Sequence, residues 1–189
     1  MPRRYYRSRI RYIAPKKKWA SNIVNGTVQI SIIGSGVESS VYGVYGQFAL
    51  AENKTQTFAP TPTIIKTANF RAQGILSFSV ESDSTTETLI TNLNCYIIYL
   101  PEGVGTVTRD IVNAHPEWIM GWTKINIVDP AGNNNNYATK FSVTSKKLKR
   151  NLNSGDKVVI AFIGDTGYTA NNTLTRQFPI TCQFTSCAN

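Results

Sequence analysis

The sequence contains few of the residue types that build catalytic and metal centres. Its 189 residues include one histidine, His115, and three cysteines, Cys95, Cys182 and Cys187. A zinc site uses several His or Cys side chains at short spacing, and a catalytic triad needs a histidine beside its nucleophile. Three scattered cysteines are expected to be small buried side chains rather than a disulfide framework. We therefore expect a non-enzyme with no catalytic residues, no metal site and no cofactor.

Long apolar runs and signal segments are also missing. No stretch approaches the roughly 18 apolar residues that span a bilayer, so no membrane insertion is expected. The N-terminal segment is basic but has no apolar core behind it, which does not fit a secretory signal. Gly34-Ser-Gly36 has no helical pattern after it, so no phosphate-binding loop is predicted.

Acidic residues are absent from the first 18 residues, where basic residues are concentrated. This segment holds eight of the 20 Lys and Arg residues and none of the 11 Asp and Glu residues. The rest of the chain carries 12 basic and 11 acidic residues and is nearly neutral. Such a basic segment is expected to be disordered unless a polyanion holds it. The sequence predicts a basic arm over residues 1–18 and one folded domain over residues 19–189.

The arm alternates basic and aromatic side chains. Arg and Lys bind phosphates through charge and counterion release, and Tyr rings stack on unpaired bases. This mixture favours single-stranded nucleic acid as the partner, DNA before RNA; the alternative is a nuclear-import signal, which can share the same residues. The predicted nucleic-acid-binding residues of the arm are Arg3, Arg4, Tyr5, Tyr6, Arg7, Arg9, Arg11, Tyr12, Lys16, Lys17 and Lys18.

From Trp19 onward, β-branched and aromatic residues dominate, and turn residues punctuate them. Strands are predicted over about 19–33, 41–50, 63–80, 87–100, 118–128, 137–144, 157–164 and 175–185. Only residues 107–115 carry helix signals, with Thr108 as the cap and Pro116 as the stop. The pattern predicts an all-β fold, a single eight-stranded antiparallel jelly roll made of two sheets. Periodicity alone leaves an immunoglobulin-like sandwich open.

A second basic cluster lies inside the folded domain, at Lys146, Lys147, Lys149 and Arg150. It follows the strand predicted over 137–144 and precedes a turn signal at 153–156. On a strand its side chains would alternate between two faces, so one row of them can face nucleic acid. The alternative is a solvated strand end that protects a sheet edge.

Three parts of the sequence resemble a known family. They are the start Met1-Pro-Arg-Arg-Tyr-Tyr-Arg7, the segment Pro116-Glu-Trp-Ile-Met-Gly-Trp122, and residues 147–156 followed by Val158-Val-Ile-Ala-Phe162. In these segments the chain resembles the capsid proteins of small circular Rep-encoding single-stranded DNA viruses, the circovirus-like (CRESS-DNA) group. Its domain is shorter than in typical circoviruses, and its arm is shorter and less charged. The coat protein of a small satellite RNA virus has a comparable layout and stays an alternative.

The resemblance implies a jelly roll that assembles into a small icosahedral (T=1) shell of about 60 copies. The arm would point inward onto a single-stranded circular DNA genome. The implied location is the virion, with assembly in the host nucleus, and the arm would double as a nuclear localisation signal. Host import factors and a receptor are the further partners that the resemblance implies.

Subunit contacts are expected at exposed apolar residues of loops and strand ends, because shell-forming jelly rolls meet edge to edge. The candidates are Tyr42, Tyr45, Ile111, Val112, Pro116 and Trp118. A basic-tailed cellular nucleic-acid-binding β-domain is the main rival, although the near-neutral domain speaks against it. A carbohydrate-binding sandwich would use Trp118 and Trp122. Both share a strand face with Met120 and are more simply explained as core or interface residues.

Overall fold

Most of the described chain is β-strand, with one short helix. The computed structural model describes residues 18–33, 42–54, 64–79, 90–126, 136–145, 149–166 and 173–188. The elements are β1 (Ala20–Ile33), β2 (Tyr42–Glu52), β3 (Ile65–Ser79), β4 (Ile90–Leu100), α1 (Arg109–Ala114), the 3-10 turn η1 (Pro116–Trp118), β5 (Ile119–Lys124), β6 (Asn136–Thr144), β7 (Lys149–Leu152), β8 (Lys157–Thr166) and β9 (Thr173–Ala188). The prediction of an all-β fold is confirmed.

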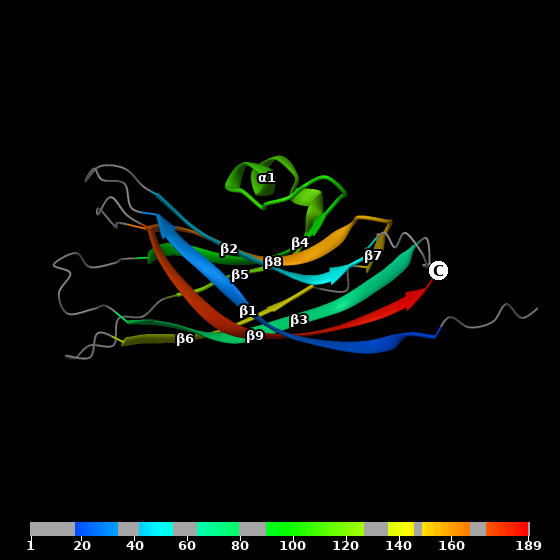
Figure 1. Cartoon of the computed structure of the whole chain (residues 1–189), viewed down its shortest axis with the longest axis horizontal. Helices are drawn as coiled ribbons and strands as arrows, with labels where there is room; N and C mark the ends of the chain where they lie inside the picture. The colour runs from blue at the N-terminus through cyan, green and yellow to red at the C-terminus, as the bar shows by residue number, and fades with distance from the viewer. Residues whose placement is uncertain are drawn as a thin grey trace, which may run out of the picture.

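The strands form one antiparallel sheet that curls into a half-barrel (Figure 1). Their order is β5-β4-β8-β2-β1-β9-β3-β6, and β7 pairs with β3 outside this path. β1 and β9 pair over the full length of β1, from Ala20 opposite Ser186 to Ile33 opposite Thr173. Neighbours in the sheet are therefore mostly strands that lie far apart in the sequence.

The described residues form nine strands, where eight were predicted for the chain. The additional strand is β7, which the sequence presents as a basic stretch between two strands. Thr67 of β3 pairs with Arg150 of β7, whereas residues 71–79 of β3 pair with β6. Because β3 is 15 residues long, it accommodates β7 and β6 one after the other on the side away from β9.

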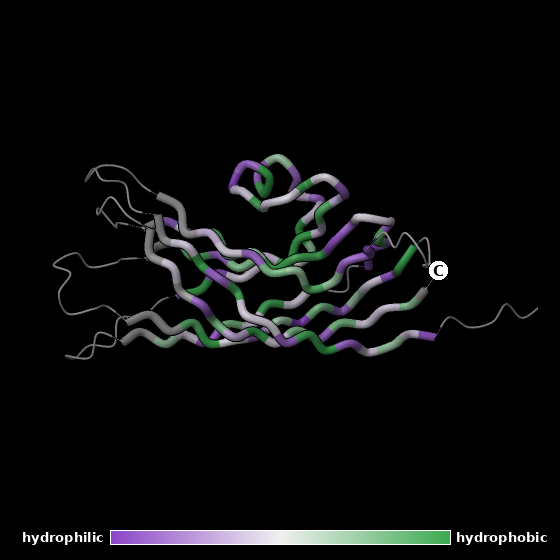
Figure 2. The backbone as a smooth tube through the Cα atoms, viewed as in Figure 1, coloured by the Kyte–Doolittle hydropathy of each residue, from purple (hydrophilic) through white to green (hydrophobic). Residues whose placement is uncertain are grey.

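The main core lies on the concave side of the sheet. Successive side chains of a strand point to opposite faces, and Figure 2 shows the resulting alternation of hydrophobic and hydrophilic residues. Leu93, Cys95 and Ile97 of β4 belong to this core. The rings of Phe141 in β6 and Phe162 in β8 meet edge to face, with centroids 5.2 Å apart. The two halves of the curled sheet therefore face one another across a shared apolar interior.

The two ends of the sheet approach each other at Gly121 in β5. A Cβ atom on this residue would lie far inside van der Waals contact with the carbonyl oxygen of Thr144, at the end of β6. Only glycine allows the two backbones to come so close. The absence of a side chain at this position thus lets the sheet curl nearly to closure.

Helix α1 covers the convex side of the sheet over β4 and β8 (Figure 1). A second apolar cluster lies beneath it, in which Val112 of α1 packs with Ile98 of β4 and Ile163 of β8. The helix predicted over residues 107–115 is confirmed. Thr108 caps it, its hydroxyl accepting a hydrogen bond from the backbone N–H of Ile111 at 3.3 Å.

Candidate nucleic-acid interface

The structure describes the root of the predicted arm. Lys18 is the only predicted arm residue among the described residues, and its side chain is exposed. Trp19 follows it with 41% of its surface exposed, and β1 then begins at Ala20. The other predicted arm residues lie outside the described residues, as do Lys146 and Lys147 of the second basic cluster.

The root of the arm meets the second basic cluster. Lys149 Nζ lies 5.6 Å from the centroid of the Trp19 ring, which is a cation–π distance. The pairing of the strands explains this contact. Ser186 of β9 lies opposite Ala20 on one side and Thr67 on the other, and β7 pairs with Thr67 in turn. The sheet therefore brings the start of β1 and the start of β7 to the same end of the domain.

An open depression of about 480 Å³ lies beside this contact. We call it the basic groove; it is lined by Lys66, Tyr99, Lys149, Arg150 and Asn151. The guanidinium of Arg150 lies 5.5 Å from the centroid of the Tyr99 ring. The three cations suit a phosphate, and the aromatic ring suits an unpaired base. The amide suits a polar edge of a base or sugar.

Asp156 fixes the aromatic side of the groove. This carboxylate is buried and accepts hydrogen bonds from the Tyr99 hydroxyl at 2.8 Å, the backbone N–H of Asn153 at 2.8 Å and that of Glu102 at 3.0 Å. Burial, together with the hydrogen bond to Asp156, raises the pKa of Tyr99 to about 12. Tyr99 therefore presents a neutral ring in one orientation at physiological pH.

Arg150 also connects the groove to the segment between β4 and β5. Its guanidinium donates a hydrogen bond to the backbone carbonyl of Glu117 in η1. The Glu117 carboxylate accepts a hydrogen bond from His115 Nδ1 at 3.0 Å. Hydrogen bonds from its own backbone N–H and from His115 hold the pKa of Glu117 below its usual range. Arg150 is thus anchored, while no ion pair engages Lys66 or Lys149 within the described part of the chain.

The predicted subunit contacts lie in different environments. Pro116 is exposed, and Ile111, Tyr45 and Trp118 are partly buried. Tyr45 and Trp118 pack against the second apolar cluster. The side chain of Tyr42 lies outside the described residues. Val112 was expected to be exposed, and this is wrong: it is only 8% exposed because it lies on the face of α1 that packs on the sheet.

Other apolar side chains are more exposed than Tyr45, Ile111, Val112 and Trp118. Trp122 is 62% exposed, whereas Met120 is 2% exposed. The expected shared face fails because the pairing of β4 with β5 shifts register between Ile97 and Ile98, so Met120 turns into the core. Among the strand residues whose side chains the structure describes, Ile23 and Ile75 are the other large exposed apolar ones, at 67% and 49%.

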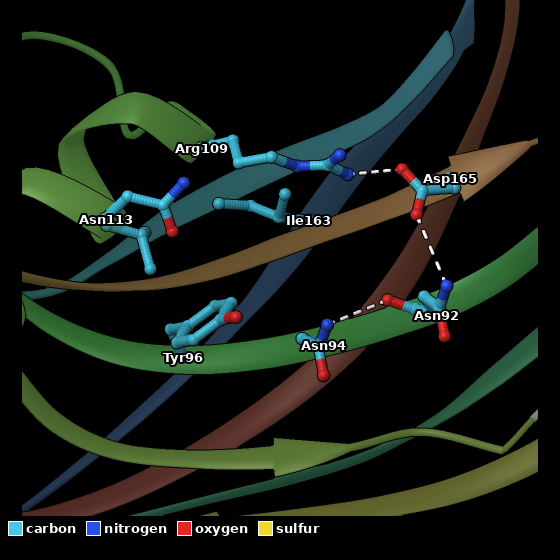
Figure 3. A pocket seen from close by; sticks show the side chains of 8 residues that line it. Asn92, Asn94, Tyr96, Arg109, Asn113, Ile163 and Asp165 are labelled. Carbon is cyan, nitrogen blue, oxygen red and sulfur yellow. Dashed lines mark hydrogen bonds and ion pairs between the residues drawn. The ribbon is translucent and has the colours of Figure 1, made fainter. Parts of the chain in front are cut away.

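A second polar pocket lies between α1 and the convex face of β4 and β8 (Figure 3). Its volume is about 160 Å³. Arg109 of α1 forms an ion pair with Asp165 of β8, and the other oxygen of Asp165 accepts a hydrogen bond from the Asn92 amide at 3.4 Å. Both charged side chains of this pocket are thus already paired, and their bonds tie α1 to the sheet.

The described residues offer no metal site. They hold no group of three or more His, Cys, Asp or Glu side chains placed to bind a metal. Cys95, Cys182 and Cys187 are free and buried; burial raises the pKa of Cys95 well above its usual value and that of Cys182 to about 11. In the described part of the chain, no helix has the length and apolarity needed to cross a membrane.

Comparison with known protein families finds no model that matches this chain, and comparison with curated proteins finds no matching sequence. The function is therefore argued from the residues and their geometry.

Sequence reasoning missed four residues of this interface, Trp19, Lys66, Tyr99 and Asn151. Trp19 had a signal, because it is an aromatic residue at the junction between the arm and the domain. Lys66 and Tyr99 had none. Lys66 reaches the groove because β3 pairs it with Asn151, and Tyr99 reaches it through its bond to Asp156.

Proposed function

We propose that this protein is the capsid protein of a small virus with a single-stranded circular DNA genome, as its resemblance to the circovirus-like group implies. Its domain assembles into a small icosahedral shell, and its arm packages the genome. One observation carries the proposal: the contact between Trp19 and Lys149 joins the root of the basic arm to the basic groove. The arm, which holds eight basic residues and accounts for most of the net charge of +9, thus joins the near-neutral domain beside this groove.

The strand order supports a jelly roll. With β7 set aside, the first strand pairs with the last, the second with the seventh, the third with the sixth and the fourth with the fifth. This is the pairing of one long hairpin with four strands on each side. Winding such a hairpin also sets β9 beside β3 and β8 beside β4, as two Greek keys do.

In this proposal the curled sheet divides into two sheets of four strands. One is β1-β9-β3-β6 and the other is β5-β4-β8-β2, with the β1–β2 pair as the link between them. The contact between Phe141 and Phe162 then lies in the core between the sheets. These are the two sheets that the eight-stranded prediction requires, with β7 as an addition at the edge.

Assembly into a shell would raise the affinity with which a short arm binds nucleic acid. Eight basic residues on one chain bind single-stranded nucleic acid weakly at physiological salt. A closed shell of about 60 copies directs roughly 480 such charges at one molecule. The exposed Trp122 lies on β5, a terminal strand of the sheet path. Aromatic residues of this kind are enriched at protein interfaces, which supports a subunit contact there.

Electron microscopy and light scattering of the purified full chain test this function. We expect closed particles of megadalton mass that contain nuclease-protected single-stranded DNA. A 20.9 kDa monomer at all salt concentrations, with or without added single-stranded DNA, would contradict the capsid proposal and favour a basic-tailed cellular nucleic-acid-binding domain. Particles that protect RNA instead would favour the coat protein of a satellite RNA virus.

A further inference from the structure

The strands β1, β9, β3 and β6 carry basic residues and no acidic ones. Their basic positions are Lys66, Arg71, Lys140 and Arg176. All six carboxylates of the described residues belong to other elements: Glu52, Glu102, Asp110, Glu117, Asp156 and Asp165. The division of charge inside the domain therefore follows the division of the sheet, although the domain as a whole is nearly neutral.

Two shallow depressions adjoin on the convex face of these four strands. One of about 200 Å³ is lined by Ile23, Arg71, Gln73, Thr181 and Gln183. The other, of about 410 Å³, is lined by Arg71, Gln73, Gly74, Ile75, Lys140, Phe141 and Ser142. They share Arg71 and Gln73, so together they cross all four strands. We call this surface the sheet strip; at about 4.8 Å per strand spacing, it is roughly 14 Å wide.

The cations of the sheet strip are exposed and unpaired. Arg71 and Lys140 are both exposed, and neither takes part in an ion pair within the described part of the chain. On the part of the convex side that α1 covers, by contrast, Arg109 forms an ion pair with Asp165. Cations that have no carboxylate beside them attract a polyanion without first losing a partner.

The other side chains of the strip suit an unpaired strand. Gln73 offers a donor and an acceptor to sugars and base edges, and Thr181 and Gln183 add acceptor oxygens, since their hydroxyl and amide groups donate to Asn25 and Ser21. Ile23 and Ile75, which are 67% and 49% exposed, offer apolar surface to base faces. Arg71 and Lys140, on the neighbouring strands β3 and β6, suit contact with phosphates that does not depend on the base sequence.

We infer that the sheet strip is a second nucleic-acid contact surface, over which a stretch of packaged single-stranded DNA runs. This inference rests on the proposed function. It turns the β1-β9-β3-β6 face toward the interior of the shell and the α1 face toward the exterior. The arm leaves from β1, the strand that supplies Ile23 to the strip, so the arm and the strip reach the same nucleic acid.

The test compares two double variants of the full chain. Arg71→Glu with Lys140→Glu reverses the strip, and Lys54→Glu with Lys124→Glu makes the same charge change on other elements. Binding of a fluorescent 30-nucleotide single-stranded DNA is titrated at several salt concentrations. We expect the strip variant to bind about tenfold more weakly and its salt slope to fall by roughly 1.4, since each phosphate contact contributes about 0.7. The control should stay within about twofold of the natural chain.

Three other results overturn the inference or separate it from the proposed function. Equal binding by the two double variants overturns it. A strip variant that binds DNA like the control but stays monomeric also overturns it, because the strip is then a contact between copies of this chain. Failure of the natural chain to form particles contradicts the capsid proposal instead, and the difference in DNA binding between the two variants still decides the role of the strip.

Discussion

The two convex faces of the curled sheet differ in what lies over them. Over β4 and β8, helix α1 buries Val112 and Ile163 and pairs Arg109 with Asp165. Over β1, β9, β3 and β6, the strip residues Arg71 and Ile75 stay exposed. Outward apolar residues are thus buried by the helix on one face and exposed on the other. A charge count of the whole chain cannot detect this division, because it adds the charges of all elements together.

Removal of the arm should have the largest effect on DNA binding, and the effects of changes on the two faces are compared with it. Deleting residues 1–18 takes away eight basic residues and no acidic ones, so we expect nearly all binding to single-stranded DNA to disappear. The slope of log K against log salt should fall by roughly 5–6, at about 0.7 per phosphate. Circular dichroism should report an unchanged β-domain. An unchanged salt slope would place the phosphate contacts elsewhere.

A matched pair of isoleucines sharpens the comparison between the faces. Ile98 is fully buried beneath α1, whereas Ile75 is 49% exposed on the strip. Ile98→Ala should lower the free energy of unfolding by about 2–5 kcal/mol through lost burial and a cavity. Ile75→Ala should change it by no more than about 0.5 kcal/mol. Urea denaturation of both variants measures the difference, and equal losses would mean that the strip face is covered within the domain.

The basic groove is lined by residues of β3, β4 and β7, and we expect reversal of its cations to have a smaller effect. Lys66→Glu with Lys149→Glu should weaken DNA binding about tenfold, because two cations that line the groove are reversed. Lys54→Glu with Lys124→Glu again serves as the control, since neither residue lines the groove. If both double variants package the same amount of DNA, Lys149 belongs to a solvated strand end that protects the sheet edge.

The smallest effect concerns Tyr99 at high pH. Its pKa is raised to about 12 from about 10 in an unfolded chain, so the folded state keeps the phenol proton longer. The resulting stability is fully present below pH 10 and is lost as the pH rises toward 12. Tyr99→Phe should flatten this part of the stability curve, as measured by urea denaturation between pH 9 and 12. A parallel fall in both proteins would assign the pH dependence to other groups.

Some elements of the fold could be predicted from the sequence, and others could not. The helix at Arg109–Ala114 was predicted because its signals, Thr108 and Pro116, are local. β7 was missed because its four residues form a strand only through pairing with a distant segment of β3. Val112 was placed on the surface because a short helix does not reveal which of its sides packs on a sheet.

The sequence by itself determined the all-β character, the basic arm and the near-neutral domain. These follow from residue type, strand periodicity and the local concentration of charge, which need no knowledge of distant contacts. Only the tertiary structure decided that Trp19 meets Lys149, that Lys66 and Tyr99 join the basic groove, and that β1, β9, β3 and β6, which hold no carboxylate, lie side by side. The reason is physical: antiparallel pairing of segments far apart in the chain sets which side chains become neighbours, and the local sequence of one segment does not encode its partner.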